Sequence, residues 1–372
     1  QAPIKINSGV KVTGGNDEKD VKIRGIEEAL STRAFGIAPE TDYGKSHVHD
    51  TLIDHARAFL TMSGEASVMS MGRDELIKRA MGSTDFPIAL ANVLNKTLKS
   101  RFTAAEPVWR KFATKVSAND FKAIASVRVD GSFVPEELTE GGEYKEKVFK
   151  ETGDSFGLKT FGEKISLTRK MMINDDLSAF TNSAPLFANG FMRLQAGIVY
   201  GLLTMNSGLG RQLADGVKLF NAATHKNYVS SGTVMSLTAF NLAKVAMRRQ
   251  LGLDGQPIQI TPMYLLVPPE LETLATQLIN STITPNETNQ ANPFKGAFQI
   301  LVDPYLTSAT NWYIIANPAE IDIIKYATLN GQEGIFTEQR YNFDNDNLEI
   351  KVRNDFNATI EEFRGIYKNV GA

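Results

Sequence analysis

The sequence predicts an α+β fold organised around one long helix, and three observations support this class. Residues 183–206 carry apolar side chains at every third or fourth position, the spacing of one helix face. Residues 207–325 alternate helical patterns with short apolar runs typical of buried strands. Residues 131–164 are strongly polar, with charges of alternating sign, and this pattern indicates a long two-stranded hairpin.

The long helix has a defined apolar face and a clear predicted start. Ser183 is a suitable N-cap, and Pro185 then falls in the first turn, where its missing N–H costs nothing. The helix is expected to end at Gly208 or Gly210. The predicted apolar face consists of Phe187, Phe191, Leu194, Ile198, Leu202 and Met205.

Three glycines interrupt this helical pattern, at Gly190, Gly197 and Gly201. Each costs about 1 kcal/mol in a helix interior. We expect them to let another backbone approach the helix closely.

The composition excludes several classes of function. The 372 residues are 42% hydrophobic and 22% charged, which is ordinary for a soluble globular protein with two or three compact units. The formal net charge of −2 provides no basic field to hold nucleic acid. There are no cysteines, so disulfides, thiolate catalysis and cysteine metal sites are excluded. No apolar run reaches the length of about 18 residues that a membrane span needs. Because the chain begins with Gln1, we expect a processed product or a trimmed chain.

The N-terminal part is predicted to be an arm followed by short helices. Residues 1–40 show little apolar periodicity and are expected to be extended, becoming ordered only against other surfaces. Helical patterns follow at 52–60, 71–81 and 86–102, and 107–116 forms a further short element.

The middle of the chain is predicted to contain the hairpin. Residues 121–129 alternate as a half-buried strand, and the hairpin turn is expected at 152–154. The hairpin has too few apolar residues to be stable alone, so we expect a neighbouring copy to stabilise it, with a mobile surface loop as the alternative. Residues 165–173 are predicted to be a returning strand, and 174–176 to open a short helix.

The remaining elements alternate between helices and strands. A helix is predicted to start at Ser236 or Thr238, a second helix to span 270–279, and 281–295 to form an exposed loop. Strands are predicted at 263–267, 298–302, 312–316, 321–326, 348–353 and 358–367, the last two separated by residues 354–355.

Few residues are of the types that support catalysis or metal binding. His47, His49 and His55 lie near Asp50 and Asp54, but their spacing fits no closed zinc pattern, and surface polar residues are the preferred interpretation.

The other candidates are weaker still. Asp344, Asp346 and Glu349 share only composition with calcium loops, and a solvated turn is favoured. The fourth histidine, His225, has no Ser or Asp motif beside it, and no nucleophile elbow or phosphate loop is present. We therefore predict no enzyme activity, no catalytic residue, no cofactor and no metal site.

The order of these elements resembles that of a known family. An arm, a strand, a charged hairpin, a long helix, an α/β insert and C-terminal strands together resemble the major capsid protein of tailed bacteriophages, with the Hong Kong 97 phage fold. TDFPIALANVLNKTL at 84–98, the segment around Trp109 and LEIKVRNDFNATIEEFRGIYKN at 348–369 resemble Mu-like major head subunits.

The resemblance implies a role for each segment. Residues 121–129 and 348–367 would form the long sheet beside the spine helix. The implied parts are an N-terminal arm and short helix (1–65), the first part of the peripheral domain (66–130), the extension loop (131–164), the spine helix of the peripheral domain (165–206), the axial domain (207–325) and the C-terminal strands of the peripheral domain (326–372).

The resemblance also implies function and partners. The chain would assemble into pentamers and hexamers of an icosahedral shell that encloses double-stranded DNA without sequence-specific contact. It would be assembled in the bacterial host cytoplasm and reside in the virion capsid, with no membrane contact. Scaffold, maturation protease, portal and decoration proteins are the implied partners. In some relatives an extension-loop lysine is crosslinked to an asparagine, but no partner is identifiable here for Lys145, Lys147, Lys150 or Lys159, so no crosslink is predicted.

Two alternatives remain open from the sequence. An encapsulin-type nanocompartment would share the fold but hold a protein cargo. An α/β enzyme or sugar-binding domain centred on 207–325 is the less favoured alternative. For the capsid, we also hypothesise that the long helix flexes at its three glycines during shell expansion.

Overall fold

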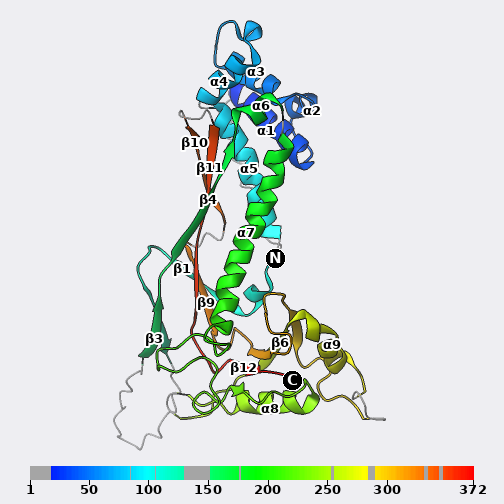
Figure 1. Ribbon diagram of the computed structural model, residues 1–372, viewed down its shortest axis with the longest axis vertical. Helices are drawn as coiled ribbons and strands as arrows, with labels where there is room; N and C mark the ends of the chain where they lie inside the picture. The colour runs from blue at the N-terminus through cyan, green and yellow to red at the C-terminus, as the bar shows by residue number, and fades with distance from the viewer. Residues whose placement is uncertain are drawn as a thin grey trace, which may run out of the picture. The chain divides into compact units, whose positions relative to one another are not determined.

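The α+β class is confirmed by the computed structural model, which describes residues 18–83, 85–104, 106–129, 151–175, 177–252, 255–283, 290–330, 334–342 and 347–372 (Figure 1). The chain divides into two compact units. Unit 1 comprises residues 1–104, 162–189 and 334–354, and unit 2 comprises residues 105–161, 190–333 and 355–372.

Unit 1 is built mainly from helices, which are coloured blue to cyan in Figure 1 up to α5. They are α1 (Glu18–Phe35), α2 (Asp42–Ser46), α3 (Leu52–Met62), α4 (Arg73–Gly82), α5 (Asp85–Ala104) and α6 (Arg169–Ile173), with a 3₁₀ turn at Val68–Ser70. The helices predicted at 52–60, 71–81 and 86–102 are therefore confirmed as α3, α4 and α5.

The prediction of an extended arm over 1–40 is wrong for its second half, which is helix α1. The apolar stripe of α1 is narrow and consists of the buried Ile26, Ala29 and Leu30. One buried carboxylate, Glu28, lies among them, so the periodicity was too weak to recognise. Residues 1–17 lie outside the described part of the chain.

Helix α3 begins with a reciprocal cap that explains its sharp start. The Thr51 side chain accepts a hydrogen bond from the Asp54 N–H, and the Asp54 carboxylate accepts one from the Thr51 N–H. Asp175 adds a long-range cap, since its carboxylate accepts from the Leu52 N–H at 2.9 Å and forms an ion pair with Arg33. Residues 174–175 therefore follow α6 as a turn, and the helix expected to open there is not a separate short helix, because the helix that begins at Leu177 is the long one itself.

Helix α7 (Leu177–Thr204) is longer at its N-terminus than predicted. Ser183 is not its cap, and Pro185 lies inside the helix rather than in its first turn. A proline signal alone does not fix a helix start, because an interior proline is tolerated where the local packing compensates for its lost hydrogen bond.

The buried face of α7 is also shifted from the predicted one. Met205 is exposed and Phe187, Leu194 and Ile198 are only partly buried. Among the described residues outside the helix, no atom lies within 4 Å of a Cβ built at any of the three glycines, so the expected close backbone approach is not made by these residues. Among the described residues of α7, the buried ones are Ala188, Phe191, Gln195, Ala196, Val199, Tyr200, Leu202 and Leu203.

One sheet contains the long strand β11 (Asn347–Ile360). Within unit 1, β11 pairs antiparallel with β10 (Phe336–Asn342), which the sequence analysis missed. Within unit 2, it pairs antiparallel with β9 (Ile324–Leu329), and β9 pairs parallel with β1 (Ala113–Ala118). Strand β4 (Lys159–Leu167) also pairs with β11.

Several strand predictions need correction in this sheet. Residues 354–355 do not separate two strands, because β11 runs through them without a break. The strand at 121–129 is not part of this sheet, and β1 takes that place beside β9. The returning strand ends at Leu167, since 169–173 form α6. Gly162 permits a close strand contact in unit 1, where a Cβ would lie 2.9 Å from the Val352 carbonyl oxygen.

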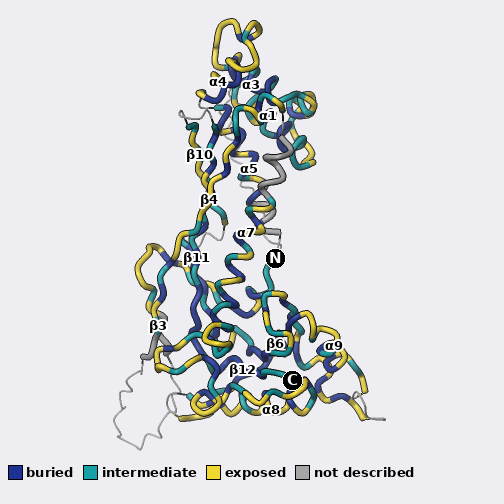
Figure 2. The backbone as a smooth tube through the Cα atoms, in the orientation of Figure 1, coloured by how far each residue is buried: buried dark blue, intermediate teal, exposed yellow. Residues whose placement is uncertain are grey.

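A second sheet lies within unit 2, in the order β5-β12-β8-β6-β7. Its strands are β5 (Tyr228–Val229), β12 (Ile366–Asn369), β8 (Trp312–Ala316), β6 (Pro262–Val267) and β7 (Gln299–Val302). Figure 2 colours much of β6 and β12 as buried, and every residue of β8 is buried. The runs predicted at 263–267, 298–302 and 312–316 are therefore confirmed as β6, β7 and β8.

Helices α8 (Leu237–Arg248) and α9 (Glu272–Asn280) belong to the same unit. Ser236 is the N-cap of α8, which confirms one of the two predicted start positions of this helix. The loop expected over 281–295 is exposed at most of its described residues, but Asn292 and Phe294 are buried, and the Asn292 amide donates to the carbonyl oxygens of Leu278 and Ser281. Residues 284–289 lie outside the described residues.

Candidate functional site

The hairpin is the first candidate site, and its position in the sequence differs from the prediction. Strands β2 (Ile124–Val129) and β3 (Glu151–Phe156) pair antiparallel, with Ile124 opposite Phe156 and Val129 opposite Glu151. Residues 152–154 are therefore inside a strand and are not the turn. The connection falls within 130–150, outside the described residues. Among the residues that are described, neither strand pairs with a third.

The base of this ladder is fixed within unit 2. A small apolar cluster joins Ala118, Phe156, Leu158 and Ala327. The Asn357 amide donates to the Gly157 carbonyl oxygen at 2.6 Å.

Polar contacts to β11 and to Arg211 also hold the base of this ladder. The Thr160 hydroxyl donates to the Asp355 carboxylate at 2.6 Å. The Arg211 guanidinium lies 3.1 Å from the Asp154 carboxylate and also donates to the Thr359 hydroxyl. The ladder thus starts from a defined, polar and well-anchored base.

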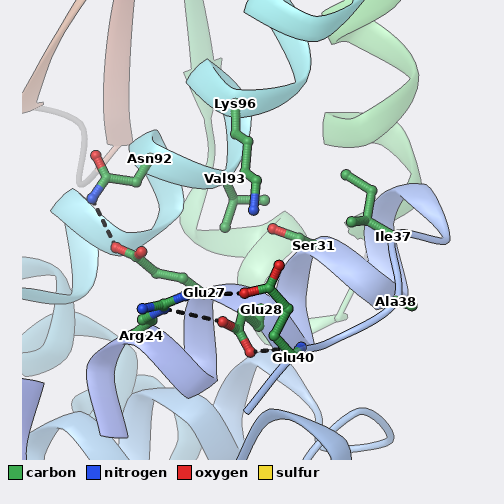
Figure 3. Close-up of a pocket in the computed structure, with 10 residues that line it drawn as sticks. All are labelled: Arg24, Glu27, Glu28, Ser31, Ile37, Ala38, Glu40, Asn92, Val93 and Lys96. Atoms are coloured by element: carbon green, nitrogen blue, oxygen red, sulfur yellow. Dashed lines mark hydrogen bonds and ion pairs between the residues drawn. The ribbon is translucent and has the colours of Figure 1, made fainter. Parts of the chain in front are cut away.

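A pocket of about 330 Å³ within unit 1 is the second candidate, and Figure 3 shows its lining. Arg24 of α1 lies 3.2 Å from the Glu28 carboxylate and 3.1 Å from that of Glu40. The Asn92 amide of α5 donates to Glu27 at 2.7 Å. Charged and amide side chains therefore converge on this hollow from α1, α5 and the segment after α1.

The carboxylates of this pocket are occupied by the protein itself. One Glu28 oxygen accepts from the backbone N–H groups of Glu40 and Thr41, at 3.1 and 2.7 Å, and from the Thr41 hydroxyl at 2.7 Å. Burial acts to raise the pKa of Glu28, but these hydrogen bonds and Arg24 outweigh it and lower the pKa. Burial raises the pKa of Glu27. The arrangement closes residues 36–41 onto α1 and presents no activated nucleophile.

The histidine cluster of the N-terminal part does not converge on one point. The His47 ring stacks on Tyr43 with centroids 3.9 Å apart. Asp54 is used as a helix cap, and His55 is buried with neither ring nitrogen hydrogen-bonded within the described residues. In the part of the chain that the structure describes, no group of three or more His, Asp or Glu side chains is placed to hold a metal ion.

The remaining sequence candidates have separate surroundings. Asp344, Asp346, Lys145, Lys147 and Lys150 lie outside the described residues. Lys159 is exposed in β4. The Glu349 carboxylate contacts Arg340, Asn342 and Lys164, so it serves cross-strand pairing.

The fourth histidine, His225, is buried. Its Nε2 lies 2.8 Å from the Asp215 carboxylate and its Nδ1 lies 3.0 Å from the Leu219 carbonyl oxygen. No sequence motif marks this pair, because a ten-residue separation between Asp215 and His225 fits none.

Among the helices in the described part of the chain, none combines the length and the apolar content that crossing a bilayer would require.

Comparison with protein families identifies the family of this chain. Residues 153–369 match the family described as phage capsid protein, and this match covers more than half of the chain. No curated protein sequence matches significantly.

Two capsids and a virus-like particle are among the solved structures with a similar fold. The capsid of a native GTA particle is 11% identical, with 72% of this chain and 92% of that chain covered and a TM-score of 0.49. The capsid of bacteriophage JBD30, decorated with minor capsid protein trimers, is 15% identical, covering 55% and 92%, with a TM-score of 0.43. A virus-like particle from Pyrococcus furiosus is 11% identical, covering 74% and 97%, with a TM-score of 0.39.

The α+β fold and the family match define a structural shell protein rather than an enzyme. The chain belongs to the phage capsid protein family. It is a structural component of a phage capsid.

Proposed function

We propose that this chain is a major head subunit of a tailed phage, similar to the Mu-like head subunits, which forms the pentamers and hexamers of the shell. The observation that carries the proposal is the β2–β3 ladder. It has a fixed base but, among the described residues, no third strand. An isolated two-stranded ladder is marginally stable in water, so a partner surface is expected to support it. In a shell, a neighbouring subunit supplies that surface.

We further propose the roles of the segments. Residues 131–164 contain the extension loop, 1–65 the N-terminal arm and its first helices, and 66–130 and 165–206 parts of the peripheral domain with α7 as the spine helix. Residues 207–325 form the axial domain. The pairing of β12 with β8 supports adding the last strand of 326–372 to that axial part.

The proposed contents and partners follow from charge and from assembly. The formal net charge of −2 suits a shell that encloses double-stranded DNA without gripping its sequence. A scaffold, a maturation protease, a portal and decoration proteins are the proposed partners during assembly in the host cytoplasm. No membrane contact is proposed.

The decisive experiment shortens the hairpin without disturbing its base. Residues 130–150 are replaced by Asn-Gly, because a two-residue turn of this sequence closes an antiparallel ladder where Val129 faces Glu151. We expect the variant subunit to fold, with unchanged tryptophan fluorescence, but to form no closed shells in electron micrographs. The wild type should form closed particles under the same conditions.

A matched control shortens a different hairpin in the same way. Residues 343–346 connect β10 and β11, where Asn342 faces Asn347, and are also replaced by Asn-Gly. This control should still assemble. Closed shells from the 130–150 variant would contradict the proposed role of the hairpin. Particles that contain a protein cargo instead of DNA would favour the encapsulin-type alternative.

A further inference from the structure

Lys368 of β12 is a buried cation without an acidic partner. The residue is only 2% exposed, and no carboxylate pairs with its ammonium among the described residues. Its ammonium donates one hydrogen bond, to the Gly208 carbonyl oxygen. It also lies 5.3 Å from the ring centre of Phe220, 5.6 Å from that of Tyr313 and 5.9 Å from that of Tyr228.

These contacts satisfy only part of what a buried ammonium needs. A lysine ammonium has three N–H donors, and one carbonyl uses one of them. Aromatic faces attract a cation but accept no strong hydrogen bond. A charge taken out of water is costly unless it is paired. Two donors therefore remain for an acceptor that carries negative charge.

A pocket of about 310 Å³ within unit 2 opens onto this ammonium. Water occupies about 30 Å³ per molecule, so the pocket has room for an anionic group together with several waters. Apart from Lys368, the polar residues lining the pocket are Thr204, Ser207, Thr307, Ser308, Asn311 and Tyr313. The pocket is thus lined by hydroxyl and amide groups and contains no carboxylate.

Asn311 provides a second unsatisfied group in the same pocket. Its backbone N–H donates to the Ser308 hydroxyl at 3.3 Å, while its buried Oδ1 has no hydrogen-bond partner among the described residues. An amide oxygen only accepts hydrogen bonds, so it requires a donor from the pocket. A group that carries both an anionic oxygen and an O–H would satisfy Lys368 and Asn311 together.

We propose that this pocket binds one anionic oxygen group, a phosphate or a carboxylate, with Lys368 as its charge partner and the surrounding hydroxyls as further donors. A protonated phosphate fits best, because its O–H can donate to the Asn311 Oδ1. A carboxylate would need a bridging water for that contact. The group comes either from free phosphate or from an acidic side chain of a neighbouring copy, and the second source rests on the proposed shell assembly.

The test uses full-length, unassembled subunits. Both tryptophans of the chain, Trp109 and Trp312, lie in unit 2, so tryptophan fluorescence follows the unit that holds the pocket. Thermal unfolding is measured in sodium phosphate and in sodium acetate, against sodium chloride of equal ionic strength. We expect a saturable rise of Tm with phosphate, since a ligand of the folded state stabilises it by mass action, and a smaller rise with acetate.

Variants connect the effect to the pocket. Lys368→Met should abolish the anion-dependent rise, and Lys295→Met, an exposed lysine of the same unit, should leave it intact. If Lys368→Met does not fold, Asn311→Ala gives the test, because it should weaken phosphate binding by several-fold and leave acetate binding nearly unchanged. Direct titration calorimetry of the wild type with phosphate provides an independent readout.

The outcomes separate the sources and can overturn the proposal. If free phosphate is the occupant, assembled shells and subunits bind it alike. If a neighbouring carboxylate occupies the pocket, phosphate binds subunits but not shells and slows assembly. Failure of assembly alone would leave the subunit measurement intact. No saturable effect of either anion on wild-type subunits would overturn the proposal and leave Lys368 as a cap for the carbonyl groups after α7.

Discussion

The two units hold their buried histidines in different ways. His55 of unit 1 and His225 of unit 2 are each 1% exposed. Both ring nitrogens of His225 have acceptors, at 2.8 Å from Asp215 and 3.0 Å from Leu219, and its ring stacks on Phe363 at 3.8 Å. Neither ring nitrogen of His55 has a partner among the described residues.

The two units also differ in how many aromatic rings surround a buried phenylalanine. Phe240 of unit 2 lies 5.5 to 5.9 Å from the rings of Phe294, Phe298 and Trp312. Phe59 of unit 1 lies 5.5 Å from the ring of Phe86, its one aromatic neighbour among the described residues. At these two pairs of sites the buried rings of unit 2 have more partners than those of unit 1, and unit 1 should therefore respond to conditions that charge the unpartnered ring of His55.

The largest expected effect comes from removing these rings. Phe240→Ala should destabilise unit 2 by about 3–5 kcal/mol, because it leaves a cavity among three aromatic neighbours. Phe59→Ala should also destabilise unit 1, by a free energy at the lower end of the same range, because Phe59 has fewer aromatic neighbours. Denaturant unfolding of unassembled subunits, followed by tryptophan fluorescence for unit 2 and by hydrogen exchange in α3 for unit 1, measures both. Equal losses would contradict the difference in packing.

Acid should act on unit 1 through His55. Burial lowers the pKa of His55 from 6.5 to about 4, and the nearby Arg33 and His47 act in the same direction, against Asp50 and Asp54. The unfolded chain therefore binds a proton that the folded chain does not between these pH values. Stability is full above pH 6.5 and falls as the pH drops toward 4, by about 3 kcal/mol in total. Hydrogen exchange in α3 across this range measures the loss.

Substitutions assign this acid response to one residue. His55→Leu should flatten the pH dependence, because an apolar side chain replaces a ring that makes no hydrogen bond in the described structure. His47→Asn removes a partly exposed histidine from the same segment and should retain most of the dependence. An unchanged slope in His55→Leu would show that another group titrates.

Local signals in the sequence predicted part of this structure. The helical pattern of 52–60 and the apolar run of 263–267 are complete within a few residues, so α3 and β6 were found where they lie. The resemblance to the phage capsid family rested mainly on element order, and the family match confirms it, whereas the likeness to Mu-like head subunits stays a prediction. Helix α1 was missed because its stripe of Ile26, Ala29 and Leu30 contains a buried carboxylate, which only the hydrogen bonds from residues 40 and 41 explain.

Features that depend on distant partners could not be predicted. The pairing of β1 with β9 joins residues more than 200 positions apart, and β1 alone is a short, mixed pattern. The hairpin turn was misplaced because Thr152 and Gly153 are turn-type residues that the ladder nonetheless holds in a strand. The sequence likewise shows no difference between His55 and His225, because their partners lie elsewhere in the chain.

A medium effect is expected when the partner of His225 is removed. Asp215→Ala takes away the carboxylate 2.8 Å from Nε2 and the acceptor of the Val217 N–H. A buried polar atom left unsatisfied costs about 1–3 kcal/mol. In this variant the Nε2 atom of His225 loses its acceptor and is left unpaired, as both ring nitrogens of His55 are. The unfolding midpoint of unit 2, followed by tryptophan fluorescence, should therefore fall. Asp120→Ala, an exposed residue of the same unit, should leave the midpoint unchanged.

Alanine substitutions at two helical glycines should change the stability of the two units in opposite directions. A Cβ at Gly25 of α1 would lie 2.8 Å from the Tyr43 ring, so Gly25→Ala must displace that ring and should destabilise unit 1 by about 1–3 kcal/mol. A Cβ at Gly197 of α7 meets nothing within 4 Å outside the helix. Gly197→Ala should therefore stabilise unit 2 by about 0.5–1 kcal/mol, because alanine loses less backbone entropy in a helix. Opposite shifts in the two unfolding measurements would confirm the pair.

The open surroundings of Gly190, Gly197 and Gly201 also sharpen the hypothesis that α7 flexes during shell expansion. Since no described residue outside the helix lies within 4 Å of a Cβ at these positions, the cost of keeping three glycines there supports a need for a bendable backbone. Replacing all three by alanine should give subunits that are more stable and still assemble, but shells that expand more slowly. Time-resolved light scattering of purified shells measures the rate. Expansion at the wild-type rate would remove the hypothesis and leave the three glycines without a structural explanation.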